Sequence, residues 1–248
     1  MGMPVVTVAS GGLPVVDNTA AALKSGTPVT ESTGTVKYGV AVTKVASGGM
    51  PVVYETIGVS VPTATIWNTA DLTAVNLTNG SLTETATAIA SGVRGVGSIT
   101  SGKYYCEYKI SNIIANALSV GFCLASTSLV TANPLGAAVM NRLGAIFVNN
   151  VNSGVSLGTR ANNDIIGVAI DVTGKLIWFR VAPAGTWNAS GTADPATGAG
   201  GINITSIATG DLFPCAINGG SGDSITANFG ASAFSGAVPS GYTAGILV

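Results

Sequence analysis

Histidine is absent from this chain of 248 residues, and charged side chains are scarce. Asp, Glu, Lys and Arg together make up 8% of the residues, against about 25% in an average soluble protein, and the formal net charge is -1. Without histidine, the chain lacks the commonest general base and the commonest metal ligand. A nucleophilic triad that uses histidine as its base is therefore excluded.

The low content of charge excludes further classes of protein. Ten Lys and Arg residues spread along the chain cannot form a stripe that follows a phosphate backbone, so we expect no nucleic-acid binding. A membrane span needs about 18 uninterrupted apolar residues. The most apolar stretch, 164–182, is interrupted by Asp171, Lys175 and Arg180, so we expect no membrane insertion. Residues 1–12 also lack the charged and apolar regions of a signal peptide.

Cysteine is sparse as well. Cys106, Cys123 and Cys215 are an odd number and include no Cys-x-x-Cys pair, so they cannot form a disulfide framework. We expect buried thiols that behave as small hydrophobic side chains, in a protein made in a reducing compartment. A bridge between Cys106 and Cys123 is the alternative.

Residues 1–60 contain an internal repeat with the unit Gly-x-Pro-Val-Val and near variants of it. A nine-residue version at 8–16 recurs at 45–53 with one substitution. Glycine permits a turn, proline fixes φ, and the two β-branched residues favour a short strand. The apolar side chains that recur in these units are Pro4, Val5, Val6, Leu13, Pro14, Val15, Val16, Met50, Pro51, Val52 and Val53.

The repeat segment has too few large side chains to build a core of its own. Tyr38 and Tyr54 are its only aromatic residues, and isolated short hairpins are marginally stable in water. We therefore expect residues 1–60 to be an extended β-repeat segment that becomes ordered against sister copies or a large protein assembly, as an anchor. A flexible linker without a partner is the alternative, although linkers are usually richer in polar residues.

Residues 61–248 show short apolar or alternating runs separated by clusters of Gly, Asn, Ser, Thr and Pro, which predict an all-β sandwich or barrel. In 104–110, large apolar side chains alternate with a second face that includes Glu107 and Lys109, so this strand is expected to be half-buried. Both faces of 165–171 are apolar, which predicts a central strand. The expected strands are 104–110, 118–124, 144–148, 165–171, 176–181, 213–217 and 224–229.

The order of several motifs in residues 65–245 resembles that of SPRY domains. The motifs are Trp67-Asn68, the strand at 102–108 (GKYYCEY), 120–122 (VGF), 164–171 (DIIGVAID), 174–179 (GKLIWF), 212–214 (LFP) and 228–230 (NFG). Cys106 stands where the family usually has an aromatic residue. The resemblance implies a two-sheet antiparallel jelly roll of the concanavalin-A-like type. It also implies a binding module without catalysis.

In SPRY domains the loops at one rim of the sandwich form the binding surface. The resemblance places the corresponding loops at about 127–142, 149–163 and 181–201. Arg142, Arg160, Trp187 and Asn188 are the side chains in these loops best suited to contact a ligand. For Trp187, packing in the core or at the rim is an equal alternative.

Catalytic and metal sites are weakly supported. Asp164 and Asp171 flank one predicted strand, but a separation of seven residues points them to opposite faces, so we expect them to be turn acids rather than a glycosidase pair. Residues 162–164 and 218–223 offer oxygen ligands for calcium, but their Asn, Asp and Gly are the residues that turns require. We therefore expect no enzyme activity, no metal and no cofactor.

The repeat segment resembles, in style, those of structural proteins of tailed bacteriophages. This predicts a virion protein assembled in the host cytoplasm. The first interpretation is a head fibre or capsid decoration protein, attached to the major capsid protein or another virion protein. A homo-oligomer is expected, with a trimer as our choice. The alternatives are a tail-associated protein that binds a receptor or a host-surface glycan, and a polysaccharide depolymerase that depends on Asp164 or Asp171.

Overall fold

The computed structural model describes residues 63–115 and 117–247. The predicted anchor segment at 1–60 lies outside these residues, together with all the repeated proline, valine, leucine and methionine side chains named for it. Residues from Thr63 onward form a unit of their own, and it is this domain that the structure describes.

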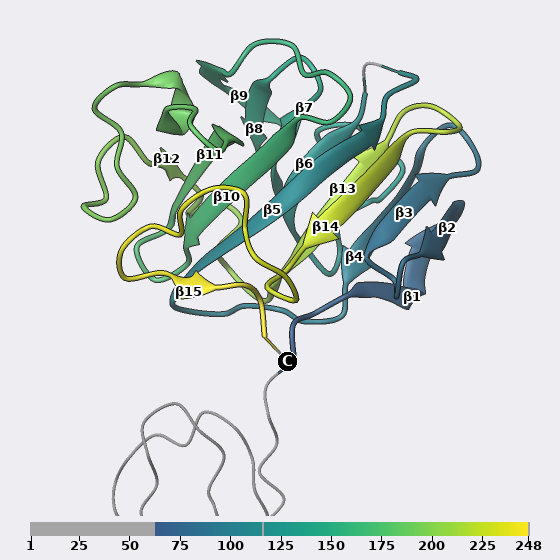
Figure 1. The fold of residues 1–248 in the computed structure, drawn as a ribbon, viewed down its shortest axis with the longest axis horizontal. Helices are drawn as coiled ribbons and strands as arrows, with labels where there is room; N and C mark the ends of the chain where they lie inside the picture. The colour runs from purple at the N-terminus through teal and green to yellow at the C-terminus, as the bar shows by residue number, and fades with distance from the viewer. Residues whose placement is uncertain (1–62, 116, 248) are drawn as a thin grey trace, which may run out of the picture. The chain divides into compact units, whose positions relative to one another are not determined.

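Nearly all regular structure in the described residues is β-strand, arranged as two sheets packed face to face (Figure 1). The seven-stranded sheet has the order β1 (Trp67–Thr73), β4 (Ser91–Gly95), β13 (Leu212–Asn218), β6 (Ser119–Leu124), β7 (Ala137–Asn141), β8 (Ala145–Val148) and β9 (Val151–Ser156). The eight-stranded sheet has the order β12 (Ile202–Asn203), β11 (Leu176–Ala182), β10 (Ile165–Asp171), β5 (Lys103–Asn112), β14 (Ser224–Asn228), β3 (Thr83–Ala86) and β2 (Val75–Thr78), and β15 (Thr243–Ala244) pairs with β5 in parallel.

The predicted all-β sandwich of antiparallel sheets is confirmed. The seven strands expected from the sequence coincide with β5, β6, β8, β10, β11, β13 and β14, and β10 is the central strand that was expected, between β11 and β5. The helical element of the described residues is a single 3-10 turn, η1 (Trp187–Ala189). None of the helices in these residues has the length and apolarity needed to cross a membrane.

Large aromatic side chains fill the space between the sheets. Trp67 and Phe229 pack edge to face with ring centroids 5.0 Å apart, and Tyr108 lies 6.2 Å from Trp67. The indole N–H of Trp67 donates to the Leu82 carbonyl (3.0 Å), and the Tyr108 hydroxyl donates to the Gly121 carbonyl (2.8 Å). Because these polar atoms have partners, the rings can be fully buried without an unsatisfied donor.

The strand register places several loops at one end of the sandwich. In the seven-stranded sheet, Ser91 of β4 pairs with Asn218 of β13, so the loops beside these two residues lie at the same end. In the eight-stranded sheet, Ile165 of β10 likewise pairs with Ala182 of β11. Loops 87–90, 157–164 and 219–223 each pass from one sheet to the other there. We call this end the distal rim, formed by loops 87–90, 113–115, 142–144, 157–164, 183–186 and 219–223.

The described chain begins at the opposite end, which we call the proximal rim. Trp67 pairs with Gly95, at the end of β4 that lies away from the distal rim. The N–H of Thr65 donates to the Ile246 carbonyl (2.8 Å), so the start and the end of the domain lie together (Figure 1). Thr63, where the repeat segment joins the domain, is therefore on the proximal side.

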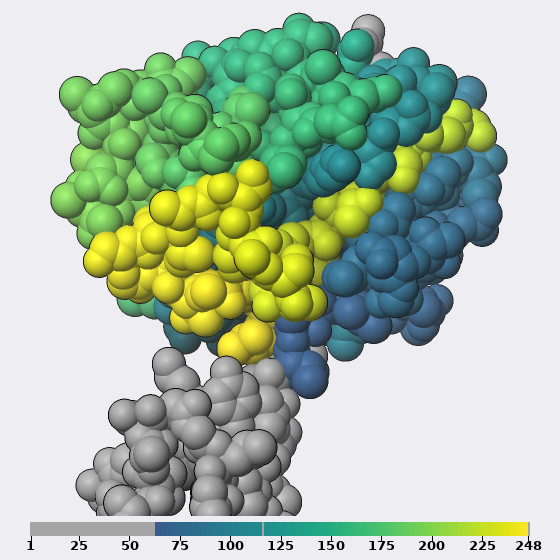
Figure 2. All heavy atoms as spheres, viewed as in Figure 1, coloured from purple at the N-terminus to yellow at the C-terminus, as the bar shows by residue number. Residues whose placement is uncertain are grey.

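The prediction that β5 is half-buried holds only in part, because its outer face is exposed at Lys109 but covered at Tyr105 and Glu107. Tyr105 is fully buried and Glu107 is 3% exposed, although both lie on the face expected to contact solvent. The segment that follows β14 crosses this outer face of the sheet, and its residues lie on the front of the domain, in yellow, in Figure 2. Phe234 from this segment packs edge to face on Tyr105 with ring centroids 5.0 Å apart.

The three loops expected to form one rim are divided between the two ends. Loop 125–136 and the turn at 149–150 lie at the proximal rim, whereas 142–144, 157–164 and 183–186 lie at the distal rim. The reason is that β7, β8 and β9 form a meander, in which consecutive turns necessarily lie at opposite ends.

The three cysteines are free and buried, in line with the prediction. Cys106 belongs to the core between the sheets. Cys123 and Cys215 belong to a separate cluster with Val139, on the other side of the seven-stranded sheet. The alternative bridge between Cys106 and Cys123 is therefore absent because the sheet backbone separates the two side chains.

Candidate recognition surface

Arg160 holds loop 157–164 in a fixed shape. Its guanidinium donates to the carbonyls of Leu157 (2.6 Å) and Gly158 (2.9 Å), and it lies 3.6 Å from the Asp164 carboxylate. Asp164 in turn accepts the N–H of Ala161 (2.9 Å). Since its side chain is 12% exposed, Arg160 shapes this loop more than it presents a free positive charge. A loop ordered in this way loses little entropy on binding a partner.

The β7–β8 turn packs against the same loop and brings Arg142 beside it. The N–H of Arg160 donates to the Arg142 carbonyl (2.7 Å), and the N–H of Leu157 donates to the Gly144 carbonyl (2.9 Å). A Cβ atom at Gly144, where φ is +79°, would lie 2.1 Å from the Gly158 carbonyl oxygen, so only glycine fits. The two arginines predicted as contact residues thus lie on neighbouring segments of the distal rim.

Trp187 packs on the outer face of the eight-stranded sheet. Its ring centre is 4.4 Å from the guanidinium carbon of Arg180, and its ring lies edge-on to Tyr105 with centroids 6.2 Å apart. Arg180 is itself buried and donates to the Ala237 carbonyl (2.6 Å). Trp187 therefore joins the packed outer layer of the domain, which was the alternative considered for it, and only part of its ring reaches solvent.

Asn188 is 6% exposed and completes the edge of β11. Its Oδ1 accepts the N–H of Phe179 (2.9 Å), and its Nδ2 donates to the carbonyls of Ile177 (3.3 Å) and Gly200 (2.8 Å). β12 pairs with β11 over two residues only. Past that point, Asn188 makes the hydrogen bonds to β11 that a longer neighbouring strand would make. Both amide hydrogens of Asn188 are used by the fold, so neither is available to a ligand.

Three large apolar side chains lie exposed on the distal rim and were not among the predicted contact residues. Ile89 is 75% exposed, Ile114 is 63% exposed and Leu143 is 47% exposed, and each comes from a different loop. A contiguous apolar patch is typical of contact surfaces, whereas single exposed apolar side chains are ordinary. The proximal rim exposes some too, among them Leu135 (67%) and Val130 (44%), so exposure alone does not single out the distal rim. The available signal was an isoleucine or leucine within a short polar loop between two strands, as in Thr87-Ala88-Ile89.

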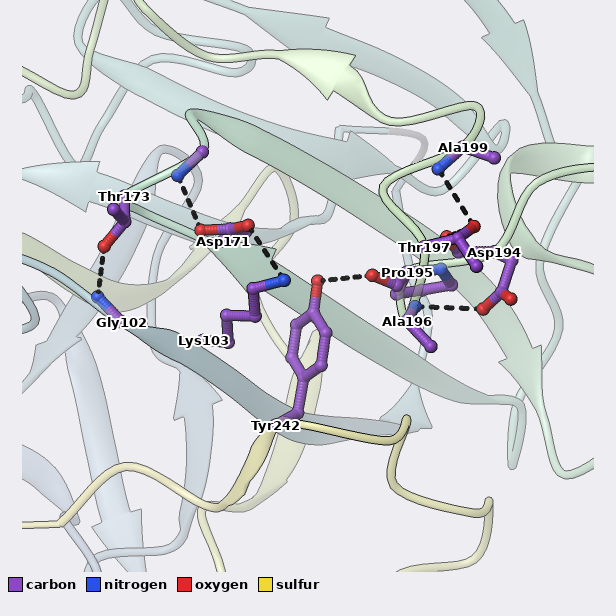
Figure 3. A network of polar contacts seen from close by, with 11 residues as sticks. Gly102, Lys103, Asp171, Thr173, Asp194, Pro195, Ala196, Thr197, Ala199 and Tyr242 are labelled. Atoms are coloured by element: carbon purple, nitrogen blue, oxygen red, sulfur yellow. Dashed lines mark hydrogen bonds and ion pairs between the residues drawn. The ribbon is translucent and has the colours of Figure 1, made fainter.

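Asp171 belongs to a polar network at the proximal end of β10 (Figure 3). Its carboxylate accepts the N–H of Gly174 (2.6 Å) and lies 3.3 Å from the ammonium of Lys103. The Lys103 ammonium is 5.6 Å from the centre of the Tyr242 ring, and the Tyr242 hydroxyl donates to the Pro195 carbonyl (3.3 Å). The network ties the start of β5 to loop 191–201 and to the C-terminal segment.

Asp164 and Asp171 do not form a catalytic pair. Asp164 precedes β10 at the distal rim and Asp171 ends β10 at the proximal rim, so the length of the strand separates them. A glycosidase needs two carboxylates within about 5–10 Å on either side of one bond. Each acid instead accepts a backbone N–H within its own turn, the structural role predicted for it.

The two loops considered for calcium are turns closed by their own aspartates. In 218–223, the Asp223 carboxylate accepts the N–H groups of Ile114 (2.5 Å), Ala115 (3.2 Å), Gly219 (3.2 Å) and Gly220 (2.8 Å). A carboxylate has about four acceptor positions, and four N–H donors use them. Within the part of the chain that the structure describes, no group of three or more His, Cys, Asp or Glu is arranged to hold a metal ion.

Glu107 is a second buried carboxylate that is fully bonded. It accepts the Tyr105 hydroxyl (2.6 Å) and the N–H groups of Ser235 (2.8 Å) and Gly236 (2.7 Å). Burial raises the pKa of the Tyr105 hydroxyl above its usual range, so it stays a donor to this carboxylate. These bonds hold the C-terminal segment on the sheet, which makes Glu107 a structural residue.

Comparison with solved structures identifies the type of fold. The SPRY domain of human HERC1 is similar with a TM-score of 0.52 and 15% identity, over 65% of this chain and 96% of that chain. The PSpry domain of TRIM65 is similar with a TM-score of 0.47 and 11% identity, over 67% of this chain and 92% of that chain. No family model matches the sequence. No curated protein matches it either. The domain thus has a SPRY-like fold, and at this identity the likeness concerns the fold alone.

Proposed function

We propose that this chain is a structural protein of a bacteriophage virion, a head fibre or capsid decoration protein. Residues 1–60 would attach it to the major capsid protein or to another virion protein. The observation that carries the proposal is the position of Thr63 on the proximal rim, at the opposite end from the distal loops. A domain attached at this end presents its distal rim away from the support.

The contrast between the two parts of the chain also supports an anchor. The described domain buries Trp67, Tyr108 and Phe229 between its own sheets, so its core needs no partner. The repeat segment offers Tyr38 and Tyr54 as its only large rings. An apolar segment with too few large side chains for a core of its own is expected to gain stability by contact with other chains, so it suits attachment to an assembly.

The oligomeric state and location follow from the same proposal. A repeat that orders against sister copies gives a homo-oligomer, for which we propose a trimer with closed symmetry. Assembly in the host cytoplasm and incorporation into the virion agree with the free, buried thiols of the domain.

Binding to empty capsid shells tests this proposal. The full chain should co-sediment with shells, and a variant with Val6, Val16 and Val53 replaced by serine should lose most of this binding. Replacement of Val96, which is 48% exposed on the domain, by serine is the matched control and should bind as the unmodified chain does. Shell binding that survives the triple replacement would refute attachment through the repeats.

A tail-associated receptor- or glycan-binding protein is the second candidate. The exposed Leu143 favours it, because its turn packs beside the ordered loop 157–164 on the distal rim, where a ligand would meet a preformed surface. This candidate predicts that the full chain binds host-surface glycans and that Leu143→Ser weakens the binding with unchanged thermal stability. Shell binding without glycan binding would favour the decoration protein.

A further inference from the structure

Glu84 of β3 is fully buried and meets Asn218 of β13 across the inside of the sandwich. The amide Nδ2 of Asn218 donates to Oε2 of Glu84 at 2.9 Å. The other two atoms of the pair, Glu84 Oε1 and Asn218 Oδ1, are buried and have no hydrogen-bond partner among the described residues. If Glu84 were ionised, both would be acceptors without a donor, which is rare and costly inside a protein.

Rotation of the Asn218 amide does not remove the conflict. The amide oxygen would then face Oε2 and the amide nitrogen would face Oε1, so one pair of acceptors would again lack a hydrogen. A carboxylic acid supplies the missing hydrogen, since its O–H can donate to the amide oxygen while its carbonyl accepts from the amide nitrogen. One proton shared between Glu84 Oε1 and Asn218 Oδ1 would satisfy both open atoms.

The surrounding charges favour the same protonation state. Burial, and after it the negative charge of Asp223, outweigh the hydrogen bonds from Asn218 and from the Ile225 backbone, and they raise the pKa of Glu84 to about 8. The strands beside β3, β2 and β14, carry no ionisable side chain, and in the opposite sheet β4 and β13 carry Arg94 and Cys215. Arg94 is bonded to Asp71, and Cys215 lies on the far side of its sheet, so no cation neutralises Glu84.

We propose that Glu84 is a neutral carboxylic acid in the native protein and that its proton locks the distal rim. The adjacent Asp223 carboxylate holds loop 113–115 through the N–H groups of Ile114 and Ala115, and it closes loop 219–223. The carbonyl of Asp223 also accepts the N–H of Ala86, the residue that ends β3 (2.8 Å). Loss of the Glu84 proton would place a second buried negative charge beside Asp223. The two carboxylates would then repel each other, and loops 113–115 and 219–223 would separate to relieve this repulsion.

The pH range of this lock follows from proton linkage. In the unfolded chain Glu84 has its ordinary pKa of 4.5, whereas in the folded chain the pKa is about 8. The folded state therefore binds more protons between these values, so the contribution to stability is complete below 4.5, falls as the pH rises to about 8, and is constant above. The folding equilibrium constant should fall by about three orders of magnitude over this range through Glu84 alone.

Glu84→Gln tests the proposal in the full chain, because glutamine keeps both bonds to Asn218 and cannot ionise. Urea unfolding between pH 5 and 9 should show the stability of the unmodified chain falling relative to that of E84Q by about a hundredfold or more in the folding constant. Amide exchange at Ile114, Ala115 and Gly220 should accelerate with pH more in the unmodified chain than in E84Q. Ser91→Ala, beside Asn218 in the ladder, is the control and should keep the pH profile of the unmodified chain.

If the stability of E84Q and that of the unmodified chain change with pH in the same way, the proposal is overturned. Stabilisation of the unmodified chain, but not of E84Q, by added calcium or sodium would also overturn it, because the open oxygens would then hold a cation. If E84Q does not fold, the carboxyl carbon resonance of Glu84 in the unmodified chain gives the answer. A titration midpoint near 8 supports the lock, and a midpoint near 4.5 contradicts it.

Discussion

Buried polar side chains in this domain bond to backbone N–H and carbonyl groups that have no partner in a neighbouring strand. Asn188 replaces a strand beside β11, and Glu107 fixes the C-terminal segment. Arg94 pairs with Asp71 (2.7 Å) and donates to the carbonyls of Leu124 and Thr127, which holds the β6–β7 loop. Charge in this chain is scarce, and in the described domain much of it has a structural role rather than a place on the surface.

Asn188→Ala should lower the free energy of unfolding by about 2–4 kcal/mol. The change leaves the N–H of Phe179 and the carbonyls of Ile177 and Gly200 without partners, and an unsatisfied buried group costs about 1–3 kcal/mol. Urea unfolding monitored by tryptophan fluorescence measures the loss. Asn76→Ala, at an exposed position of β2, is the control and should change stability by less than about 0.5 kcal/mol.

The three thiols should be unreactive in the folded protein because all three are buried. The hydrogen bond with the Cys215 thiol lowers the pKa of Cys123, so inaccessibility alone protects that residue. Burial raises the pKa of the Cys106 thiol to about 12, so at pH 8 it is protonated as well as inaccessible. Cys123 and Cys215 lie diagonally on neighbouring strands, at a Cα separation of about 7–8 Å that does not suit a disulfide. A thiol reagent should modify none of them in the native chain and all three after unfolding without reductant. Fewer than three in the unfolded chain would reveal a bridge.

Among the elements, β9 is an open edge of the seven-stranded sheet without the usual protection by lysine or proline. Its own side chains cover its N–H groups instead. Asn152 accepts the N–H of Gly154 (2.8 Å), Ser153 accepts that of Val155 (3.3 Å), and Ser156 accepts that of Gly158 (3.2 Å). Local side-chain bonds therefore occupy two N–H groups of β9 and one just beyond it, which reduces the donors left for pairing with another chain.

Replacement of Asn152, Ser153 and Ser156 by alanine should make the chain associate further through this edge. The reason is that the exposed N–H groups then lack acceptors, while Val151 remains 68% exposed beside them. Sedimentation velocity over a range of concentrations should show species larger than those of the unmodified chain. An unchanged distribution would mean that β9 is protected by its neighbours rather than by its own side chains.

The strands with a continuous apolar run or a clear alternation of side chains could be predicted from the sequence, and strands without either signal could not. β10 has apolar residues on both faces and was placed correctly, whereas β7 and β9 consist largely of Ala, Asn, Ser and Gly, which carry little strand signal. The outer face of β5 was misjudged because its cover comes from Ser235, which is 128 residues further along than Glu107. A local pattern does not report contacts at that distance.

The candidate recognition surface was predictable in part for the same reason. Arg142 and Arg160 stand out in polar loops and lie together at the distal rim, but the sequence did not show that Arg160 is bonded to its own loop. Asn188 looked like a contact residue because an asparagine in a loop is usually exposed. Its burial depends on the open edge of β11, which only the sheet order reveals.

For the molecule as a whole, the proposed function predicts different resistance to proteolysis in its two parts. In dilute solution of the free chain, a nonspecific protease should trim residues 1–60 and leave a fragment that begins near residue 61, because the domain has its own core. Mass spectrometry of the products over time measures this. Binding to shells should protect the repeat segment. Resistance of the segment in a dilute monomer would contradict its dependence on partners.

The separation of Thr63 from the distal loops also bears on how this molecule can diversify. A segment inserted at 87–90, where Ile89 is 75% exposed, would extend the distal rim without entering the strand ladders that lead to the proximal rim. One scaffold could thus exchange this loop for another while it stays attached in the same way, and grafts at 87–90 should leave the melting temperature of the domain nearly unchanged.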